Sequence, residues 1–419
     1  MAYSIATIAN LYKKLWPEGI EHLVLGASPV LGLTPKWTKF YGDGKELAWR
    51  INNGGQVSNS ITVAQARTGQ STINKPLVKR KALYITKTLD HESLEAAENN
   101  SGALIDLVEE ATNNAMDELK RTAGQLIIGD KYNGAATGCI GRISATSTVA
   151  STSITLDDIT MVRNFYVGQS VCAFNTVGAG LLDAGEAVVI TGVNEETGVL
   201  TAGANWSTAI TGLAASDYLV GEGNFNAVPA GMFAWNPAAL IAAGAGDSFF
   251  TVDRGGSIAM QGCRYAPSSG SVDEVMIQAL HLHSNFGGEH DTAIMNPIDL
   301  GNLIQQANTL QRINENAVGS NGKKIADLSF EGIVLNGPKG KVSVYADEYM
   351  PRYKAKVYNR KTCEIWSLKE MFRLLTKGAN AEGMVRSATA DASELRFGGY
   401  WNFVVKRPRD MMDVTIPTG

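Results

Sequence analysis

The stretch from Lys45 to Gly129 constrains the fold most, because two predicted strands within it are separated by far more chain than a turn needs. Side chains from Val78 to Leu89 alternate with the period of two that is typical of a strand. Its expected partner is Lys45 to Ile51, and about 26 residues, Asn52 to Leu77, lie between them, with a tip rich in Gly, Ser, Thr and Gln. A compact domain rarely holds a loop of this length. We therefore expect a long two-stranded arm that neighbouring copies of the chain cover.

A long amphipathic helix is expected directly after the arm. Ser101 fits an N-cap, and Gly129 offers a stop. Between them, apolar residues recur at steps of three and four: Leu104, Leu107, Val108, Ala111, Ala115, Leu119, Ala123 and Leu126. At about 1.5 Å per residue, this is a rod of roughly 40 Å with one buried stripe. A two-domain enzyme could contain the same helix, and the arm in front of it favours an assembly subunit.

Composition places the chain among ordered globular proteins. Of its 419 residues, 44% are hydrophobic and 19% are charged, and this length allows two or three domains. The longest apolar stretches, such as Pro237 to Ala245, fall well below the roughly 18 residues that span a bilayer, so no membrane segment is expected. The N-terminus has no basic region before an apolar core, so we do not expect export. Cys139, Cys172, Cys263 and Cys363 are widely separated, which favours free buried thiols in a reducing cytoplasm.

The segment from Ala150 to Asn224 differs from the rest of the chain in its charge and in its pattern of predicted secondary structure. It holds eight acidic residues and one base, Arg163, whereas the remainder has 36 basic and 33 acidic residues. Short β-rich runs alternate there with turn signals, and Val193 to Gly198 is the clearest hairpin. We expect a small inserted antiparallel barrel or sandwich. The charge split suits a protein with one face near a polyanion, and a simply acidic β-domain fits it equally well.

Outside this segment, helices and strands interleave unevenly, which predicts an α+β fold. Ser271 with Glu274 fits a capping box that opens a helix to Ser284, and Pro297 starts a second helix that runs to about Leu310. Residues 1–40 indicate an extended arm with one short amphipathic helix that ends at Pro17. The expected strands are Thr292 to Asn296, Ile325 to Ile333, Lys341 to Tyr345, Lys356 to Asn359, Thr362 to Ser367 and Leu395 to Val405.

The order of these parts resembles that of a known family. The flexible N-terminal arm, the long hairpin arm and the spine helix are followed by the phrases Ala230 to Trp235, Asp247 to Arg254 and Ala293 to Pro297. Together they resemble the tailed-bacteriophage major capsid proteins of the Hong Kong ninety-seven-type fold. The resemblance covers most of the chain, and the order of the phrases matters more than any one of them.

The resemblance implies a division of the chain into named parts. These are the N-terminal arm (1–40), the extended loop or two-stranded arm (41–90), the peripheral domain with its spine helix (91–149), the inserted β-barrel-like domain (150–224), a peripheral/axial domain (225–295), the axial domain (296–384) and a C-terminal return strand (385–419).

The same resemblance implies a function. The chain would be a non-enzymatic subunit without cofactors that self-assembles into hexamers and pentamers of an icosahedral shell. The shell would enclose the phage double-stranded DNA, belong to the virion and be assembled in the host bacterial cytoplasm. Implied partners are further copies of the chain, a separate scaffolding protein, a portal and the DNA through non-specific contact, and a decoration or cement protein is allowed. An encapsulin-type bacterial nanocompartment is the first alternative, and a hydrolase with a β-rich carbohydrate-binding module is an alternative from another class.

No catalytic, cofactor or metal residue is predicted. His281 and His283 lie two apart on a predicted helix and do not share a face, which favours an ordinary helix end over a metal site. No Gly-x-Ser-x-Gly elbow is present. The resemblance implies that the basic arm lies along the acidic face of a neighbour's helix. The expected contacts between subunits are Lys75, Lys79, Arg80, Lys81, Glu92, Glu95, Glu109, Glu110, Trp16 and Trp37.

Overall fold

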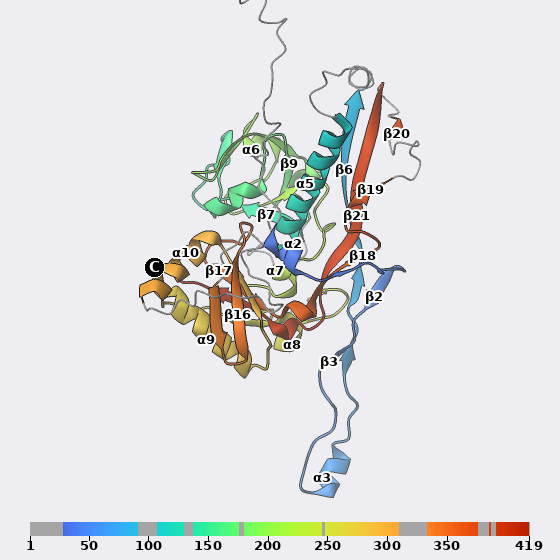
Figure 1. The fold of residues 1–419 in the computed structure, drawn as a ribbon, viewed down its shortest axis with the longest axis vertical. Coiled ribbons are helices and arrows are strands. Elements are labelled where there is room, and N and C mark those ends of the chain that lie inside the picture. Colours follow the sequence, from blue (N-terminus) through green and yellow to red (C-terminus); the bar gives the residue numbers. More distant parts are fainter. Residues whose placement is uncertain are drawn as a thin grey trace, which may run out of the picture.

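The computed structural model describes residues 28–90, 107–129, 137–175, 180–244, 248–309, 333–375, 385–386 and 391–418. Three separate sheets, each with its own apolar core, are present in these residues, together with a long arm. Helices and strands are interleaved along the chain, which confirms the predicted α+β class. Figure 1 shows the arm pointing away from a body that the sheets and their helices form.

The first sheet contains the longest strands. Its order is β1-β18-β21-β19, and β6 and β20 pair with β21 outside this path. Strand β21 pairs with β6 along ten successive residue pairs, from Ala392 with Asp90 to Trp401 with Lys81. The bounds are β1 (Lys36–Trp37), β6 (Lys81–Asp90), β18 (Cys363–Ser367), β19 (Arg373–Leu374), β20 (Val385–Arg386) and β21 (Ala392–Val405).

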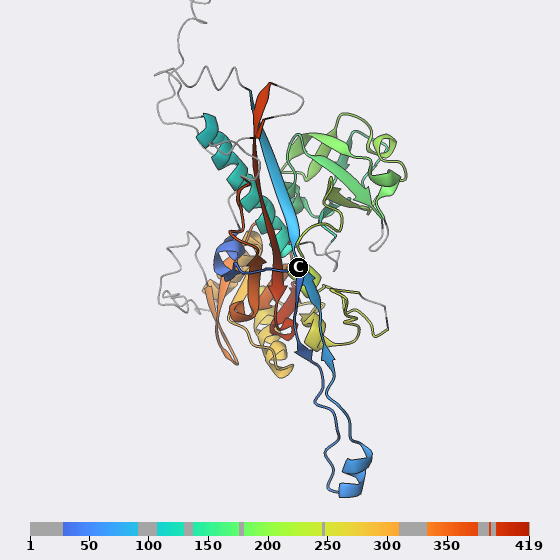
Figure 2. The same ribbon diagram turned by 90° about the vertical axis from the view of Figure 1, so that its right-hand side faces the viewer.

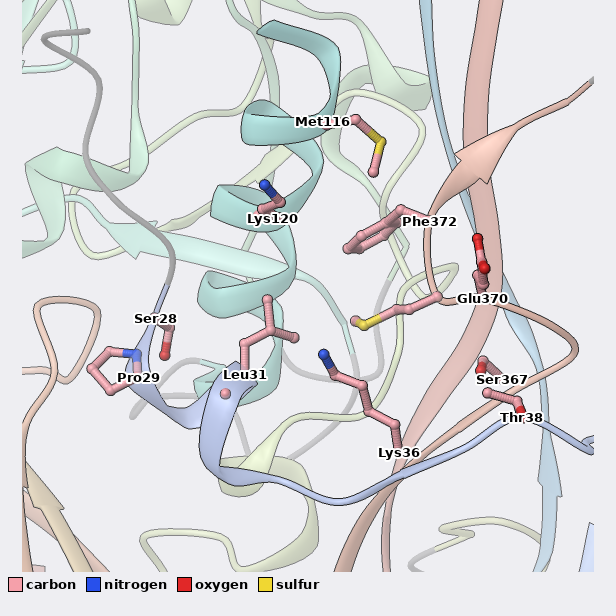
Figure 3. A pocket seen from close by; sticks show the side chains of 12 residues that line it. Ser28, Pro29, Leu31, Lys36, Thr38, Met116, Lys120, Ser367, Glu370 and Phe372 are labelled. Atoms are coloured by element: carbon pink, nitrogen blue, oxygen red, sulfur yellow. The ribbon is translucent and has the colours of Figure 1, made fainter. Parts of the chain in front are cut away.

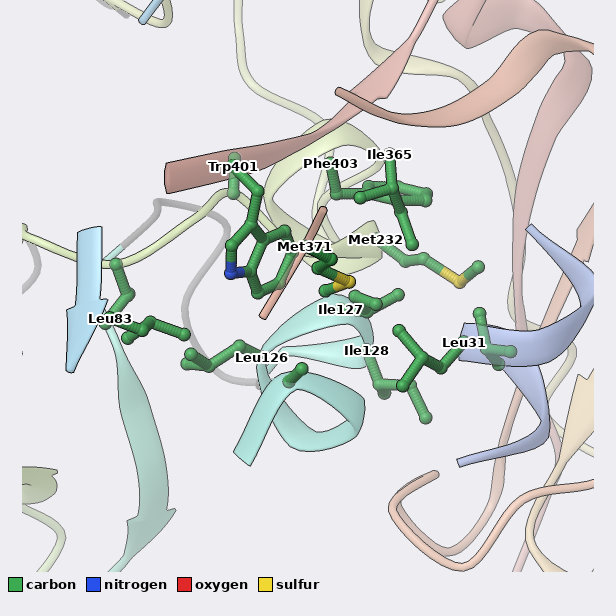
Figure 4. Packing of buried hydrophobic residues seen from close by; sticks show 14 of the residues in the cluster. Leu31, Leu83, Leu126, Ile127, Ile128, Met232, Ile365, Met371, Trp401 and Phe403 are labelled. Atoms are coloured by element: carbon green, nitrogen blue, oxygen red, sulfur yellow. The ribbon is translucent and has the colours of Figure 1, made fainter. Parts of the chain in front are cut away.

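The spine helix α5 (Leu107–Ile128) packs on this sheet. Ala115, Leu119, Ala123 and Leu126 of the predicted stripe are buried, as expected for an amphipathic helix. Figure 4 shows the end of the helix packed against Trp401 and Phe403 of β21 and against Leu31 of α2 (Pro29–Leu33). The helix ends at Gly129, whose φ of +79° is the left-handed conformation that glycine adopts most easily.

The second sheet comprises strands of the acidic segment and the strand β7 that precedes it. Its order is β7-β12-β9-β10-β11-β8, and it encloses a core around Trp206 and Ile190. The hairpin that we predicted at Val193 to Gly198 joins β10 to β11. The bounds are β7 (Cys139–Arg142), β8 (Ser153–Thr155), η1 (Ile159–Asn164), β9 (Ser170–Phe174), η2 (Leu182–Gly185), β10 (Val188–Asn194), β11 (Val199–Ala202), α6 (Trp206–Ala209) and β12 (Tyr218–Gly221).

The third sheet has the order β13-β22-β17-β14-β16-β15, and helices α9 and α10 pack on it. The capping box of Ser271 with Glu274 and the start of α10 at Pro297 are as predicted. The bounds are α7 (Met232–Trp235), α8 (Ile258–Gln261), β13 (Cys263–Tyr265), α9 (Val272–Asn285), β14 (Thr292–Met295), α10 (Pro297–Thr309), β15 (Ile333–Gly337), β16 (Gly340–Ala346), β17 (Lys354–Tyr358), η4 (Arg360–Thr362), η5 (Pro408–Asp410) and β22 (Met411–Thr415).

One predicted pairing is wrong in part. The chain from Val78 to Leu89 is two strands, β5 (Leu77–Lys79) and β6, and only β5 pairs with the segment Lys45 to Ile51. Strand β6 pairs with β21 instead. The physical reason is that Leu83 and Leu89 on one face of β6 are buried in the core beside α5, so this half of the predicted strand belongs to the body.

Other predictions concern the N-terminal arm and segments that lie partly or wholly outside the described residues. Residues 1–40 were expected to be an extended arm whose one short helix ends at Pro17, whereas Ser28 caps a further short helix, α2, with Pro29 in its first turn, and β1 follows. The predicted strand Ile325 to Ile333 lies outside the described residues except for its last position, which opens β15. The helix around Ile5 and the start of the spine at Ser101 also lie outside them. All four cysteines are free and buried, as expected.

Candidate functional site: the arm and the surface at its root

The arm is built from two short ladders and a terminal helix. Strand β2 (Gly44–Glu46) pairs with β5, and β3 (Trp49–Arg50) pairs with β4 (Ile73–Asn74), both antiparallel. Helix α3 (Ile61–Ala66) lies at the far end. In both views of Figures 1 and 2, the arm extends away from the body, with α3 at its tip. The long two-stranded arm that we predicted is therefore present, with a helix at its tip that the sequence did not indicate.

The outer arm exposes apolar side chains. Val57 is fully exposed, Ile61 is 72% exposed, and Val63 and Ile73 are 44% and 46% exposed. No residue of α3 is buried. Single exposed apolar residues are common on proteins, but several on one protruding element are typical of a surface that another molecule covers.

The root of the arm is fixed to the body by polar and aromatic contacts. The indole Nε1 of Trp49 donates to the carbonyl of Lys406 at 2.9 Å, and its ring packs edge-on against Trp235 at 6.2 Å. The amide of Leu77 donates to the carbonyl of Phe250 at 3.0 Å. Arm and body therefore form one packed unit up to Trp49, and the arm beyond it is open.

The four predicted cations of the arm differ in their surroundings. Lys75 is exposed, and Lys79 forms an exposed ion pair with Asp43 at 3.0 Å. Arg80 donates to the carbonyl of Phe40, and Lys81 donates to the carbonyl of Asn226 at 2.8 Å. Burial lowers the pKa of Lys81. Arg80 and Lys81 thus bind their own subunit, whereas Lys75 faces solvent.

The remaining predicted contact residues fall in two groups. Trp37 packs within its own subunit, with its ring centroid 5.3 Å from that of Trp366, and the Nζ of Lys45 lies 4.1 Å over it. Trp16, Glu92 and Glu95 lie outside the described residues, as do the side chains of Glu109 and Glu110 in the first turn of α5.

An apolar pocket of about 580 Å³ lies between α2, α5 and the chain that follows β18. Leu31, Met116, Met371 and Phe372 form its apolar lining. Figure 3 shows Lys36 and Lys120 beside this lining. The helices α2 and α5 that line the pocket lie in the body, whereas α3, which carries Ile61 and Val63, lies at the far tip of the arm (Figure 1).

Ser28, the N-cap of α2, lines this pocket and is closely packed. Its hydroxyl donates to the carboxylate of Asp347, and a Cβ added to Gly124 of α5 would lie only 2.6 Å from the Cβ of Ser28. Burial raises the pKa of Asp347 to about 6, although hydrogen bonds from Ser28 and from the backbone favour its charged form. These contacts join α2, the spine helix and the third sheet at one point.

No metal site emerges from the histidines. Among the described residues, no group of three or more His, Cys, Asp or Glu side chains is placed to hold a metal ion. His281 is exposed and His283 is buried, so they point in different directions, as their spacing predicted. His283 instead stacks on His290, with the two Nδ1 atoms 3.1 Å apart.

In the part of the chain that the structure describes, no helix has the length and apolar character that crossing a membrane requires.

Comparison with solved structures identifies the fold. No protein-family model and no curated protein sequence matches the chain. The capsid asymmetric unit of cyanophage A-1(L) aligns with a TM-score of 0.58 at 11% identity, and the alignment covers 100% of both chains. The chain has the fold of a phage capsid protein.

Two weaker structural matches bear related titles. The capsid of the native GTA particle aligns with a TM-score of 0.49 at 10% identity over 100% of both chains. A structure from Mycobacterium phage Ogopogo aligns with a TM-score of 0.47 at 9% identity, covering 99% of this chain and 100% of the other. The assignment of the capsid-protein fold rests on the cyanophage structure.

Sequence reasoning missed the aromatic cluster at the root of the arm. Trp235 is fully buried and contacts the rings of Phe249 and Phe250 at 5.0 and 5.2 Å. The phrases that contain these residues contributed to the family resemblance, but their packing role was not predicted. Aromatic residues in two separate phrases carry no signal of mutual contact, because the pairing is set by the tertiary fold. In the capsid-protein fold of this chain, they join the arm to the body.

Proposed function

We propose that this chain is a structural capsid subunit that assembles with copies of itself into a closed shell. The observation that carries the proposal is the arm, whose apolar side chains Val57, Ile61 and Val63 are exposed in the single chain. The capsid-protein fold over the full length of the chain supports it. Burying apolar surface is favourable by roughly 25 cal/mol per Å², so association with a neighbour supplies the free energy that the arm cannot obtain alone.

The receiving surface is the apolar pocket of a neighbouring copy. Its lining of Leu31, Met116, Met371 and Phe372 is apolar, as are the tip residues Ile61 and Val63. Helix α3 at the tip lies far from α2 and α5, which line the pocket (Figure 1), so a second copy must provide one of the two surfaces. Each subunit then both donates an arm and accepts one, which is the head-to-tail contact that closes rings.

The finer parts of the proposal follow from the family resemblance. Rings of five and six subunits form an icosahedral shell that encloses the phage double-stranded DNA as part of the virion. A separate scaffolding protein and a portal take part in assembly in the host bacterial cytoplasm. The subunit is structural and not an enzyme.

Strands β7 to β12, which span residues 139–221 and include most of the acidic segment, form an inserted domain on the outside of this subunit. Cys139 at its start pairs with Val220 at its end, so the two crossings into the body lie side by side. Its core around Trp206 is separate from that of the first sheet. It contacts the body through the ring of Tyr166, which lies 4.9 Å from the guanidinium of Arg121, and through Arg163, which donates to the carbonyl of Glu348.

Two experiments test these proposals. Particles purified from cells that express the chain are examined by electron microscopy, and closed shells or capsomers of uniform size are expected. In a second variant, residues 140–219 are replaced by a short glycine linker. Shells of unchanged diameter support an inserted domain that assembly does not need, and a soluble, folded variant that no longer assembles contradicts it.

A further inference from the structure

A strained turn lies against the root of the arm. Phe249 and Val252 form a bridge that Phe250 and Thr251 connect, and the amide of Val252 donates to the carbonyl of Phe249 at 3.1 Å. Phe250 has a φ of +49° and Thr251 a φ of +71°. A turn with both central residues at positive φ strongly favours Asn-Gly, because a β-branched side chain such as that of Thr clashes with its own backbone there.

The surrounding packing explains how this turn persists. Phe249 and Val252 are buried, and the rings of Phe249 and Phe250 lie 4.4 Å apart. The guanidinium of Arg254 lies 3.8 Å over the ring of Phe249 and donates to the carbonyl of Ala234 at 2.7 Å. Strained conformations persist where neighbouring contacts over-determine them, and they cluster at functional positions.

The strained residue presents one group to the arm. The carbonyl of Phe250 accepts the hydrogen bond from the amide of Leu77 at 3.0 Å. Leu77 begins β5 at the arm's root, and its neighbour Pro76 accepts from the amide of Leu47 on the other side of the arm. The direction of the Phe250 carbonyl, which the left-handed backbone sets, therefore fixes where the returning side of the arm leaves the body.

We propose that Phe250 and Thr251 are positioning residues that set the direction of the arm, and that their strain makes this attachment releasable. When the turn relaxes to a favoured conformation, the carbonyl of Phe250 rotates away from Leu77 and the returning side of the arm loses this contact with the body. When packing holds the turn, the arm is held in one direction. The inference concerns the attachment of the arm within one subunit, and only its relevance to a shell rests on the proposed function.

The test is the substitution Thr251→Gly, which removes strain and little else because Thr251 is exposed. The unassembled full-length chain is used, and two quantities are measured: its Tm and the hydrogen-exchange rate of the Leu77 amide. Thr251→Gly is expected to raise Tm and to slow exchange at Leu77 about tenfold, the change expected when one strained residue is relieved. Thr251→Val, which keeps the branched Cβ, is expected to behave like the wild type.

Thr88→Gly is the matched control. Thr88 is also exposed but lies in β6, where glycine is unfavourable, so this variant is expected to lower Tm. A fall in Tm for Thr251→Gly would overturn the proposal, and so would an unchanged exchange rate at Leu77. Neither readout depends on shell formation, so a failure of the proposed function would show separately as an absence of particles.

Discussion

The most informative perturbation is the removal of apolar side chains from the tip of the arm. In the double variant Val57→Ser/Ile61→Ser, both altered residues are exposed in the single chain, at 101% and 72%, so its folding stability should change little. Fully burying a Val or Ile side chain is worth about 1.5–3 kcal/mol, and about two thirds of that is available at Ile61. We expect the arm contact to weaken by about 3 kcal/mol, which is on the order of a hundredfold in the association constant.

The assay is the lowest subunit concentration at which shells form, followed by light scattering and sedimentation. The double variant should need a much higher concentration than the wild type. Val189→Ser is the matched control, since Val189 is also an exposed apolar residue but lies on β10 of the inserted domain. Met116→Ala, in the pocket, should weaken assembly and should show a smaller effect when combined with the tip variant, because contacting residues are energetically coupled. Equal assembly of the double variant, the Val189→Ser control and the wild type would refute the reasoning.

Three further predictions concern the folded subunit. Gly124→Ala should destabilise it, because the new Cβ would lie 2.6 Å from that of Ser28, whereas Gly301→Ala in α10, which meets no atom within 4 Å, should stabilise it by up to about 1 kcal/mol; urea unfolding compares the two. Trp235→Ala should cost about 3–5 kcal/mol in the same assay, and the half-buried Trp37→Ala should cost less; equal losses would contradict the packing described. Burial lowers the pKa of His283 to about 4, so its contribution, about 3 kcal/mol, is present above pH 6.5 and is lost as the pH falls towards 4. Asp347, whose pKa is raised to about 6, acts in the opposite direction, so the test is the difference in unfolding free energy between the wild type and His283→Gln across this range, and a difference that does not vary with pH would contradict it.

Local patterns predicted most of the fold. The capping box at Ser271, the proline start of α10 and the glycine stop at Gly129 are short-range signals, and the structure has each where the sequence indicated it. The arm could be predicted from the length of the segment between the two predicted strands. The partner of β6 could not be derived in this way, because Val78 to Leu89 alternates evenly and gives no sign of the change of partner after Lys79. Pairing across more than 300 residues is decided by burial against α5, which a single sequence does not display.

The candidate site was less predictable than the fold. That basic residues of the arm contact a neighbour stays a prediction, and within the single chain Arg80 and Lys81 donate to backbone carbonyls. Charge in a sequence marks residues that need a polar partner, but it does not say whether that partner is a carbonyl in the same chain. The exposed apolar residues Ile61 and Val63 were not singled out, because a short helix within a polar loop carries too few apolar residues to form a pattern.

The measurement that tests the account most directly is the size of the purified chain in solution, by analytical ultracentrifugation with electron microscopy of the same sample. We expect closed shells or capsomers of uniform size, in which limited proteolysis spares residues 52–72. A homogeneous, well-folded monomer of 44.7 kDa at high concentration, with this segment still protected from proteolysis, would contradict it. In such a monomer the arm would be covered by its own chain, and no neighbouring copy would be required.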